Sequence, residues 1–218
     1  MNYEWDILGE AGFQFFGKMS ASISHEIKNV LAILNENAGL LEDLVLLAEK
    51  GKPFDNDRIK NVAGSMKQQI KRADLITKNL NRLAHSVDEP LERVDVSEVL
   101  KLVVSLSGRF ADMKGIILKP VYATENAYIK TSPFLLEYLF YCFVEFSMAM
   151  IDDQKILEII IEETEKGFQV KFGGLTGLSE NGTNGFPSKR EDALLKAIHA
   201  EIETDVIGKI IIKFPEEV

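Results

Sequence analysis

Residues 24–29, with the sequence Ser-His-Glu-Ile-Lys-Asn, place an imidazole, a carboxylate and an amide within one long amphipathic pattern. At about 100° per residue, the apolar side chains of this pattern point away from His25; they are Phe16, Ile23, Ile27, Val30, Leu34, Ala38, Leu41 and Val45. The side chains within about 60° of His25 are small, polar or charged, namely Ser22, Asn29, Ala32 and Glu36. The sequence therefore predicts that His25 is exposed to solvent.

An exposed imidazole can act as a nucleophile, because it is largely neutral at cellular pH. Glu26 is placed to hold the ring of His25 or to accept its proton. Asn29 lies one turn further along the same face, where an amide can orient a water molecule or an oxyanion. The alternative is a solvated helix face that happens to carry a histidine.

The bulk composition is that of a globular protein. The chain has 218 residues, 46% of them hydrophobic and 27% charged, which suggests one or two domains. Its net charge of −9, with no basic stripe, argues against nucleic-acid binding. No apolar run reaches the roughly 18 residues of a membrane span, and the N-terminus is acidic where a signal peptide is basic. The single cysteine, Cys142, excludes an internal disulfide. We therefore expect a cytoplasmic protein that contacts no membrane.

Two long helices are predicted in the first half of the chain, at residues 8–50 and 57–85. The short connection between them contains Gly51 and Pro53, so the two helices should form an antiparallel hairpin. Several apolar side chains lie off the main stripe of the first helix: Phe13, Phe15, Met19, Ile33, Leu40 and Leu44. A lone hairpin would leave them uncovered, so two hairpins are expected to pair as a four-helix bundle in a homodimer.

The second half of the chain has a different sequence pattern, and Pro90 marks the boundary between the two halves. We expect a helical hairpin domain at residues 1–88 and an α/β sandwich domain at residues 89–218. Capping signals at Asp95, Ser132 and Ser188 predict helices at residues 96–113, 134–150 and 189–200. Strands are predicted at residues 115–119, 127–130, 155–164, 168–172 and 206–214. The fold class is then α+β, with one mixed sheet.

This order of elements resembles the transmitter core of two-component sensor histidine kinases, and the resemblance covers about residues 19–214. Residues 24–29 resemble the phosphoacceptor box of that family. The resemblance implies that His25 carries a phosphoryl group, that Glu26 assists proton transfer, and that Asn29 stands where the family has a phosphatase-assisting amide or threonine. Val30 occupies the position where the family often has proline.

The sandwich matches the family's ATPase domain in outline but departs from it at the nucleotide-binding residues. Phe146 stands where the family has the asparagine that holds magnesium, and phenylalanine offers no oxygen ligand. Residues 173–178 contain no acid where the family has an aspartate that reads adenine. Glu191 and Asp192 lie at the start of the last helix, where carboxylates would repel phosphates. The three departures together predict that this domain does not bind ATP.

The leading hypothesis is a histidine phosphotransferase or degenerate histidine kinase of two-component signalling. His25 would exchange a phosphoryl group with the aspartate of a response-regulator receiver domain, and Lys28 would offset charge on the phosphoryl oxygens. The chain itself is expected to bind no cofactor and no metal, because the partner receiver domain brings the Mg²⁺. The docking face for that partner is predicted to include Ala32, Ile33 and Glu36.

Three alternatives remain open at this point. One is a response-regulator phosphatase in which Asn29 aligns water. Another is a non-catalytic pseudokinase dimer that only sequesters a receiver or another kinase. The third is an ATP-dependent histidine kinase with a divergent nucleotide site. His85 and His199 are interpreted as helix C-terminal cations, since three distant histidines and one cysteine make no zinc pattern.

Overall fold

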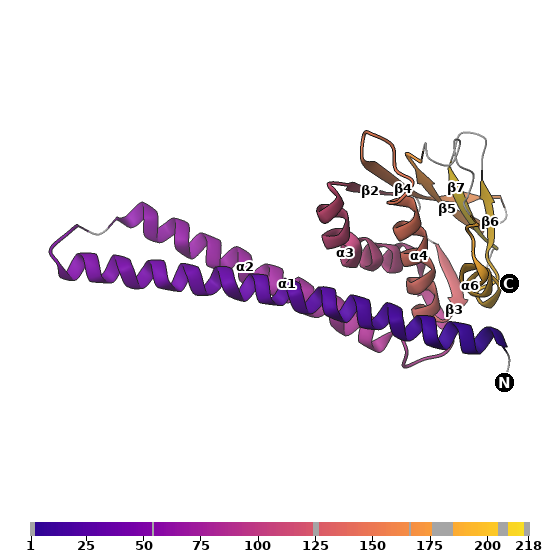
Figure 1. Cartoon of the computed structure of the whole chain (residues 1–218), viewed down its shortest axis with the longest axis horizontal. Helices are drawn as coiled ribbons and strands as arrows, with labels where there is room; N and C mark the ends of the chain where they lie inside the picture. Colours follow the sequence, from indigo (N-terminus) through magenta and orange to yellow (C-terminus); the bar gives the residue numbers. More distant parts are fainter. Residues whose placement is uncertain are drawn as a thin grey trace. The chain divides into compact units, whose positions relative to one another are not determined.

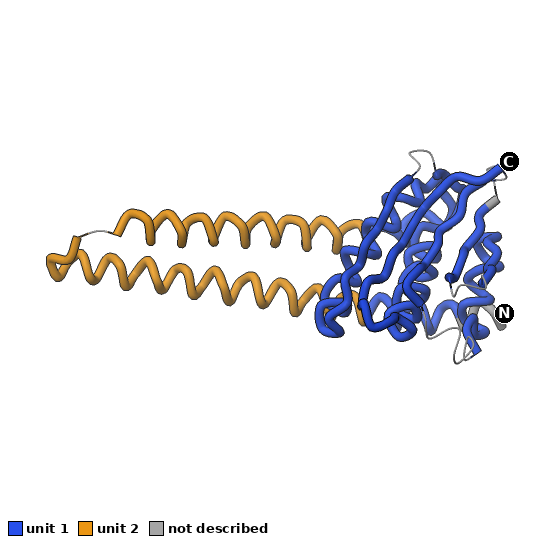
Figure 2. Tube along the Cα trace, turned by 90° about the horizontal axis from the view of Figure 1, so that it is seen from above, with its two compact units in different colours: residues 1–17, 83–218 blue, residues 18–82 orange. Residues whose placement is uncertain are grey.

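The computed structural model describes residues 3–53, 55–123, 127–165, 167–175, 185–204 and 209–215. Within it the chain divides into two compact units, shown in different colours in Figure 2. One unit is residues 18–82, and the other is residues 1–17 together with residues 83–218. Each unit is described below by itself.

The smaller unit is a hairpin of two long helices, as the periodicity predicted. Helix α1 spans Tyr3–Glu49 and helix α2 spans Asn56–His85. Gly51, with a φ of 81°, lies directly after α1, in a left-handed conformation that glycine adopts without strain. The Asp55 carboxylate accepts a hydrogen bond from the Arg58 backbone N–H at 3.0 Å and so caps the start of α2.

Residues 3–17 of α1 group with the larger unit, whereas the sequence analysis placed them in a hairpin domain at residues 1–88. The cause is visible at Phe15, which is 3% exposed. Its ring lies 5.7 Å from that of Phe134, 5.0 Å from that of Tyr138 and 5.2 Å from that of Tyr141. Phe15 was expected to be covered by a second chain, but side chains of its own chain already bury it.

The larger unit is an α/β sandwich with a mixed five-stranded sheet in the order β2-β4-β5-β7-β6 (Figure 1). Strands β2 and β4 are parallel, and the other neighbours in this sheet are antiparallel. The helices of this unit are α3 (Val96–Lys114), α4 (Pro133–Ser147) and α6 (Lys189–Ala197). The strands of the sheet are β2 (Ile117–Tyr122), β4 (Ile156–Thr164), β5 (Gly167–Gly173), β6 (Glu201–Thr204) and β7 (Ile210–Pro215).

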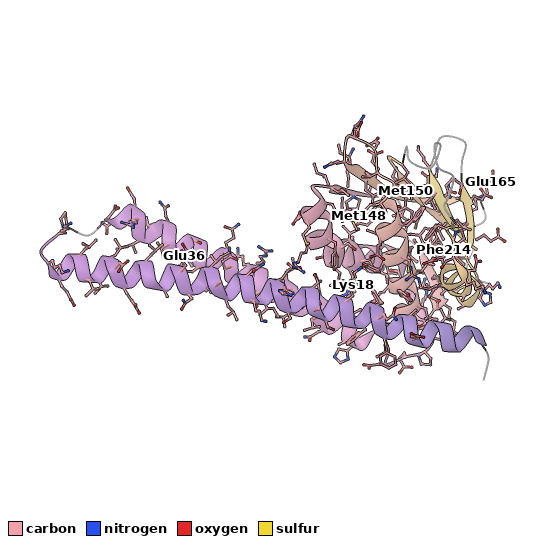
Figure 3. All side chains as sticks on the ribbon, in the orientation of Figure 1. Lys18, Glu36, Met148, Met150, Glu165 and Phe214 are labelled. Atoms are coloured by element: carbon pink, nitrogen blue, oxygen red, sulfur yellow. The ribbon has the colours of Figure 1, made fainter. Side chains whose placement is uncertain are left out.

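Apolar and polar side chains alternate along the central strands, and this alternation explains which face of the sheet packs against the helices. One set of side chains is at most 5% exposed: Leu157, Ile159, Ile161, Phe168, Val170, Phe172, Ile210, Ile212 and Phe214. Phe214, labelled in Figure 3, stacks on Phe168 with ring centroids 4.9 Å apart. The opposite set includes ion pairs between neighbouring strands, such as Lys119 with Glu158 at 2.9 Å. This is the inward-apolar, outward-polar pattern of a sheet covered on one face.

The capping signals of the sequence are confirmed. The Asp95 carboxylate accepts from the Ser97 and Glu98 N–H groups at the start of α3, and Ser132 caps α4 with Pro133 as its first residue. Ser188 and Glu191 form a capping box on α6. The fold class is therefore α+β, with a long helical hairpin and an α/β sandwich that contains a mixed sheet.

Two details of the sheet differ from the expectation. The prediction of a single sheet was wrong, because β1 (Glu92–Asp95) and β3 (Tyr128–Thr131) pair separately as a two-stranded antiparallel sheet. A last strand was expected at 206–214; residues 206–208 lie outside the described part, and β7 begins at Ile210. In the described part of the chain no helix combines the length and the apolarity that a bilayer crossing requires.

Candidate functional site

His25 lies on the solvent side of α1, as the amphipathic pattern predicted. Its side chain is exposed, and so are those of Ser24, Lys28 and Asn29. Beside His25 the apolar stripe of the same helix points inward, where Ile23 is 4% and Val30 is 1% exposed. The hairpin thus holds a nucleophilic ring in solvent on a continuous helix, which fixes its backbone.

The neighbourhood of His25 is less open than the helical wheel suggested, because Ser22 is only 3% exposed. The wheel places Ser22 about 60° from His25, near the edge of the apolar stripe. The packing of the hairpin covers that edge. The predicted exposure of His25 is confirmed, although the small polar neighbour Ser22 is buried.

Glu26 is held by a residue that the sequence reasoning missed. Its Oε2 atom lies 3.4 Å from the Arg72 guanidinium of α2, and the Glu26 side chain is 19% exposed. Arg72 is 46 residues away in the chain, so no local sequence pattern predicts its pairing with Glu26. The ion pair keeps a carboxylate beside the imidazole-bearing turn of α1 and fixes the direction in which it points.

A second bond across the hairpin sets its register. The Asn37 side-chain amide donates to the Ser65 hydroxyl at 2.9 Å, and Asn37 is 7% exposed. A part-buried polar pair of this kind penalises sliding of one helix along the other, because a shift would leave the buried Asn37 amide without its partner. The register that pairs Asn37 with Ser65 also brings Glu26 opposite Arg72, as expected for antiparallel helices.

The three residues expected on a docking face lie further along α1. Ala32 and Glu36 are exposed and Ile33 is half-buried. Figure 3 labels Glu36 on the hairpin. Successive turns of one helix therefore carry His25, Asn29, Ala32 and Glu36 in solvent.

In the sandwich unit, the end of α4 is filled by aromatic side chains. Phe146 stacks face to face on Phe186, with ring centroids 3.9 Å apart and planes 7° apart. Phe186 also meets the edge of Phe143 at 4.9 Å, and Phe143 lies 5.8 Å from Phe172. These four residues form what we call the aromatic cluster. At the position where the sequence resemblance implies a magnesium-holding asparagine, the chain has a packed hydrocarbon surface.

The N-terminus of α6 is occupied by the chain's own carboxylate. Glu191 accepts hydrogen bonds from the Ser188 backbone N–H at 2.9 Å and from Arg190 Nε at 2.7 Å. Burial would raise the pKa of Glu191, but these hydrogen bonds outweigh it and hold that pKa below its ordinary value. A buried anion, 1% exposed, therefore stands at the helix end where a phosphate would otherwise be attracted.

The segment after β5 makes a tight backbone contact. Gly174 has a φ of 86°, and a Cβ there would lie 2.5 Å from the Ile156 carbonyl oxygen. Its own carbonyl accepts the Asp152 N–H at 3.0 Å. Gly174 thus acts as the expected loop former, whereas Gly173, also expected in a loop, is the last residue of β5 and pairs with Glu158; residues 176–184 of the following glycine-rich segment lie outside the described part.

The other titratable groups fit structural roles. His85 pairs with Asp88 at 2.7 Å just after α2, and His199 lies beyond α6 with a φ of 56°. Burial raises the pKa of the Cys142 thiol, which is 1% exposed. Among the residues that the structure describes, no group of three His, Cys, Asp or Glu side chains is arranged to hold a metal ion.

Comparisons with known proteins return solved histidine kinase structures. No family model matches the chain, and no curated protein is significantly similar to it in sequence. The catalytic domain of histidine kinase ThkA aligns at 14% identity with a TM-score of 0.47, over 59% of this chain and 99% of that chain. Histidine kinase AdeS of Acinetobacter baumannii aligns at 15% identity and a TM-score of 0.45, over 88% of this chain and 97% of that chain.

A third solved structure is that of ThkA in complex with the response regulator protein TrrA. It aligns at 17% identity with a TM-score of 0.46, over 93% of this chain and 62% of that chain. These neighbours are catalytic or larger segments of histidine kinases. At such identities and TM-scores the likeness concerns the general fold alone, and residue roles have to be argued from this chain's own side chains.

Proposed function

We propose that this chain is a histidine phosphotransferase, or a degenerate histidine kinase, that exchanges a phosphoryl group between His25 and the aspartate of a response-regulator receiver domain without using ATP. The observation that carries the proposal is the solvent-exposed imidazole of His25 on a rigid helix. The aromatic cluster and the self-capped α6 support the second half of the statement. Both fill, with the chain's own side chains, places where the sequence resemblance implies magnesium and phosphate contacts.

The reaction needs few groups from this chain. In the receiver-to-histidine direction, a neutral ring nitrogen of His25 attacks phosphorus in line, so that a P–N bond forms while the P–O bond to the aspartate breaks. The aspartate leaves with the electron pair as a carboxylate. The imidazole then carries a positive charge until its other N–H loses a proton. Mg²⁺ bound by the receiver would offset the charge of the phosphoryl group.

Glu26 and Lys28 complete the arrangement. The Glu26 carboxylate, aligned by Arg72 at 3.4 Å, stabilises the imidazolium as the phosphoryl group arrives and accepts or guides its proton. Lys28 is exposed on the same turn and offsets charge on the phosphoryl oxygens. Ala32, Ile33 and Glu36 form the adjoining docking face, which is partly apolar as a transient interface requires.

A nucleotide would meet three obstacles in the sandwich. Phe146 and Phe186 offer each other ring faces instead of oxygen ligands for Mg²⁺. The Ser188 hydroxyl already accepts the Arg190 N–H in the first turn of α6, and the Glu191 carboxylate, which accepts the Ser188 N–H, would repel a phosphate. No carboxylate stands among residues 173–178 to read the adenine amino group.

The experiment is phosphotransfer from receivers of the same genome. Each purified receiver is phosphorylated with radiolabelled phosphodonor, freed of donor, and mixed with this chain and Mg²⁺. We expect acid-labile, base-stable label on the wild type, no label on His25→Ala, and retained label on the matched control His85→Ala. Label that persists in His25→Ala would contradict the proposed acceptor.

Exposed Asn29 supports one second candidate, dephosphorylation of the receiver by an aligned water molecule. In that case Asn29→Ala should abolish loss of phosphate from the receiver while His25 still becomes labelled. Equal loss of both activities would count against a separate phosphatase role. If the chain only sequesters receivers, the wild type and His25→Ala should give the same result in every assay.

The proposal includes a homodimer formed through the hairpin. Several large apolar side chains of this unit are at least 49% exposed, namely Leu31, Val45, Leu46, Ile70 and Leu75. Pairing of two hairpins into a four-helix bundle would cover such positions. Light scattering should give a dimer mass for the wild type, and a monomeric wild type at all concentrations would contradict this part.

A further inference from the structure

Four exposed lysines lie on one face of α2. We call this set the lysine stripe, and its members are Lys60, Lys67, Lys71 and Lys78. At about 100° per residue, their spacing places all four side chains within about 40° of one another around the helix. The stripe extends over about 27 Å at about 1.5 Å per residue. The sequence read in chain order gave no expectation of a basic stripe, because other residues separate its members.

Most of the lysine stripe has no carboxylate partner. α2 contains seven Lys or Arg residues and only two Asp residues. The Asp57 carboxylate lies 3.7 Å from the Lys60 ammonium. Within the part of the chain that the structure describes, no ion pair reaches the other three lysines. Lys67 and Lys71 are one turn apart, where like charges repel and weaken a helix. A negatively charged partner would relieve this repulsion.

The lysine stripe projects from the same side of the hairpin as His25. The Glu26 carboxylate and the Arg72 guanidinium meet across the seam between α1 and α2. His25 precedes Glu26 by one residue. Lys71 likewise precedes Arg72 by one residue. Antiparallel helices turn in opposite senses when viewed along a common direction, so a step of about 100° back in each helix leads from the seam to the same side. His25 and Lys71 therefore share one side of the hairpin.

The lysine stripe also runs beside the predicted docking face. The two cross-helix bonds, made by Glu26 and by Asn37, set the register of the hairpin (Figure 2). Between these two levels α1 carries the docking face at residues 32–36, and α2 carries Lys67 and Lys71. Packed helix axes are about 8–10 Å apart, and the Debye length at physiological ionic strength is about 8 Å. The field of the stripe therefore reaches the docking face.

Charge is divided unevenly between the two compact units. Residues 18–82 contain 11 Lys or Arg and 8 Asp or Glu, which gives a net charge of +3. The rest of the chain contains 14 Lys or Arg and 26 Asp or Glu, which gives a net charge of −12. The larger unit repels an acidic partner, whereas the hairpin attracts one. The net charge of −9 for the whole chain conceals this difference.

We propose that the lysine stripe attracts the acidic face of the receiver domain and guides it onto the docking face beside His25. This inference rests on the proposed function. The reacting face of a receiver is acidic, because the phosphoryl group and its aspartate lie beside the carboxylates that hold Mg²⁺. Complementary charge of this kind raises association rate constants by about 10- to 1,000-fold and affects the lifetime of the complex much less.

The test measures association separately from phosphotransfer. Each receiver of the same genome carries a fluorophore, and stopped-flow fluorescence gives its association rate constant with the full chain. The stripe variant is Lys67→Gln/Lys71→Gln/Lys78→Gln; glutamine matches lysine in helix propensity, so its Tm should stay within about 2 °C of the wild type. We expect a roughly tenfold lower association rate constant at about 0.03 M salt and less than about a twofold difference at about 0.5 M salt.

A matched control removes the same charge from the larger unit. Lys114→Gln/Lys130→Gln/Lys189→Gln replaces three exposed lysines there, and its association rate constant should stay within about twofold of the wild type. Equal rate constants for the wild type and the stripe variant at low salt would overturn the inference. Tighter binding of short duplex DNA than of any receiver, lost in the stripe variant, would also overturn it and assign the stripe to nucleic acid.

The inference and the proposed function fail in different ways. A receiver that associates through the stripe but leaves His25 unlabelled would contradict phosphotransfer and support the role of the stripe. A receiver that labels His25 with equal second-order rate constants in wild type and stripe variant would contradict the stripe alone. At saturating receiver, the labelling rate should differ by less than about twofold between the two proteins. A wild type that binds no receiver would contradict both proposals.

Discussion

Removal of the Phe186 ring tests the interpretation of the aromatic cluster as packed core. Phe186 is half-buried, stacked on Phe146 and edge-on to Phe143. A fully buried Phe→Ala change costs about 3–5 kcal/mol, so half-burial predicts a loss of about 2 kcal/mol. The sandwich unit has roughly 150 residues, for which about 2 kcal/mol lowers Tm by about 4–8 °C.

The assay is differential scanning calorimetry, with near-ultraviolet circular dichroism as a report on the rings. Phe186→Leu keeps most of the apolar contact but loses the ring geometry, so about 1 kcal/mol and a Tm decrease of about 2–4 °C are expected. Ile117→Ala is the matched control, because Ile117 is 63% exposed on β2 and should change Tm by no more than about 1 °C.

Titration with magnesium and ATP completes this test. If the ring only covered an intact nucleotide site, Phe186→Ala would uncover it. We expect no binding heat with wild type or variant, because the ligands for magnesium and adenine are also missing. An unchanged Tm would refute the packing argument, and a Phe186→Ala chain that binds magnesium-ATP would show that the site is blocked rather than lost.

Three further predictions follow from the described contacts. Glu191→Gln should destabilise the sandwich by roughly 2 kcal/mol. Because the pKa of Glu191 is lowered in the folded state, the stabilisation by its carboxylate is complete above about pH 5 and is lost as the pH falls through the folded pKa. The free energies of unfolding of wild type and Glu191→Gln should therefore converge as the pH is lowered. Arg72→Ala should shift Tm by no more than about 2 °C, since the Arg72 side chain is 49% exposed. The same change should slow labelling of His25 about tenfold, which rapid-quench measurements resolve. Cys142 should react with a thiol reagent only at the rate of unfolding, because its thiol is buried and its pKa is raised.

The sequence predicted those parts of the fold that depend on local signals. Periodicity gave both helices of the hairpin, and capping residues such as Asp95 and Ser188 gave the starts of α3 and α6. Strands β1 and β6 escaped prediction because they are four residues long and rich in charged residues. They form because β3 and β7 offer them backbone partners, and such non-local pairing leaves no pattern in the strand itself.

The candidate site also combines features that the sequence predicted with features that it did not predict. Exposure of His25 follows from helical geometry and was predicted. The pairing of Glu26 with Arg72 and that of Asn37 with Ser65 depend on the register between two helices, which helical periodicity leaves open. The sequence predicted only part of the arrangement at the start of α6. It predicted that Glu191 would repel phosphate, but it did not predict that Glu191 is buried at 1% exposure, because that depends on the tertiary packing.

The central claim is that His25 exchanges phosphate with a receiver and takes none from ATP. The most direct measurement runs two reactions in parallel on the full chain, one with phosphorylated receiver and one with radiolabelled ATP and Mg²⁺. We expect acid-labile label on His25 from the receiver alone. Label that arrives from ATP and vanishes in His25→Ala would contradict it.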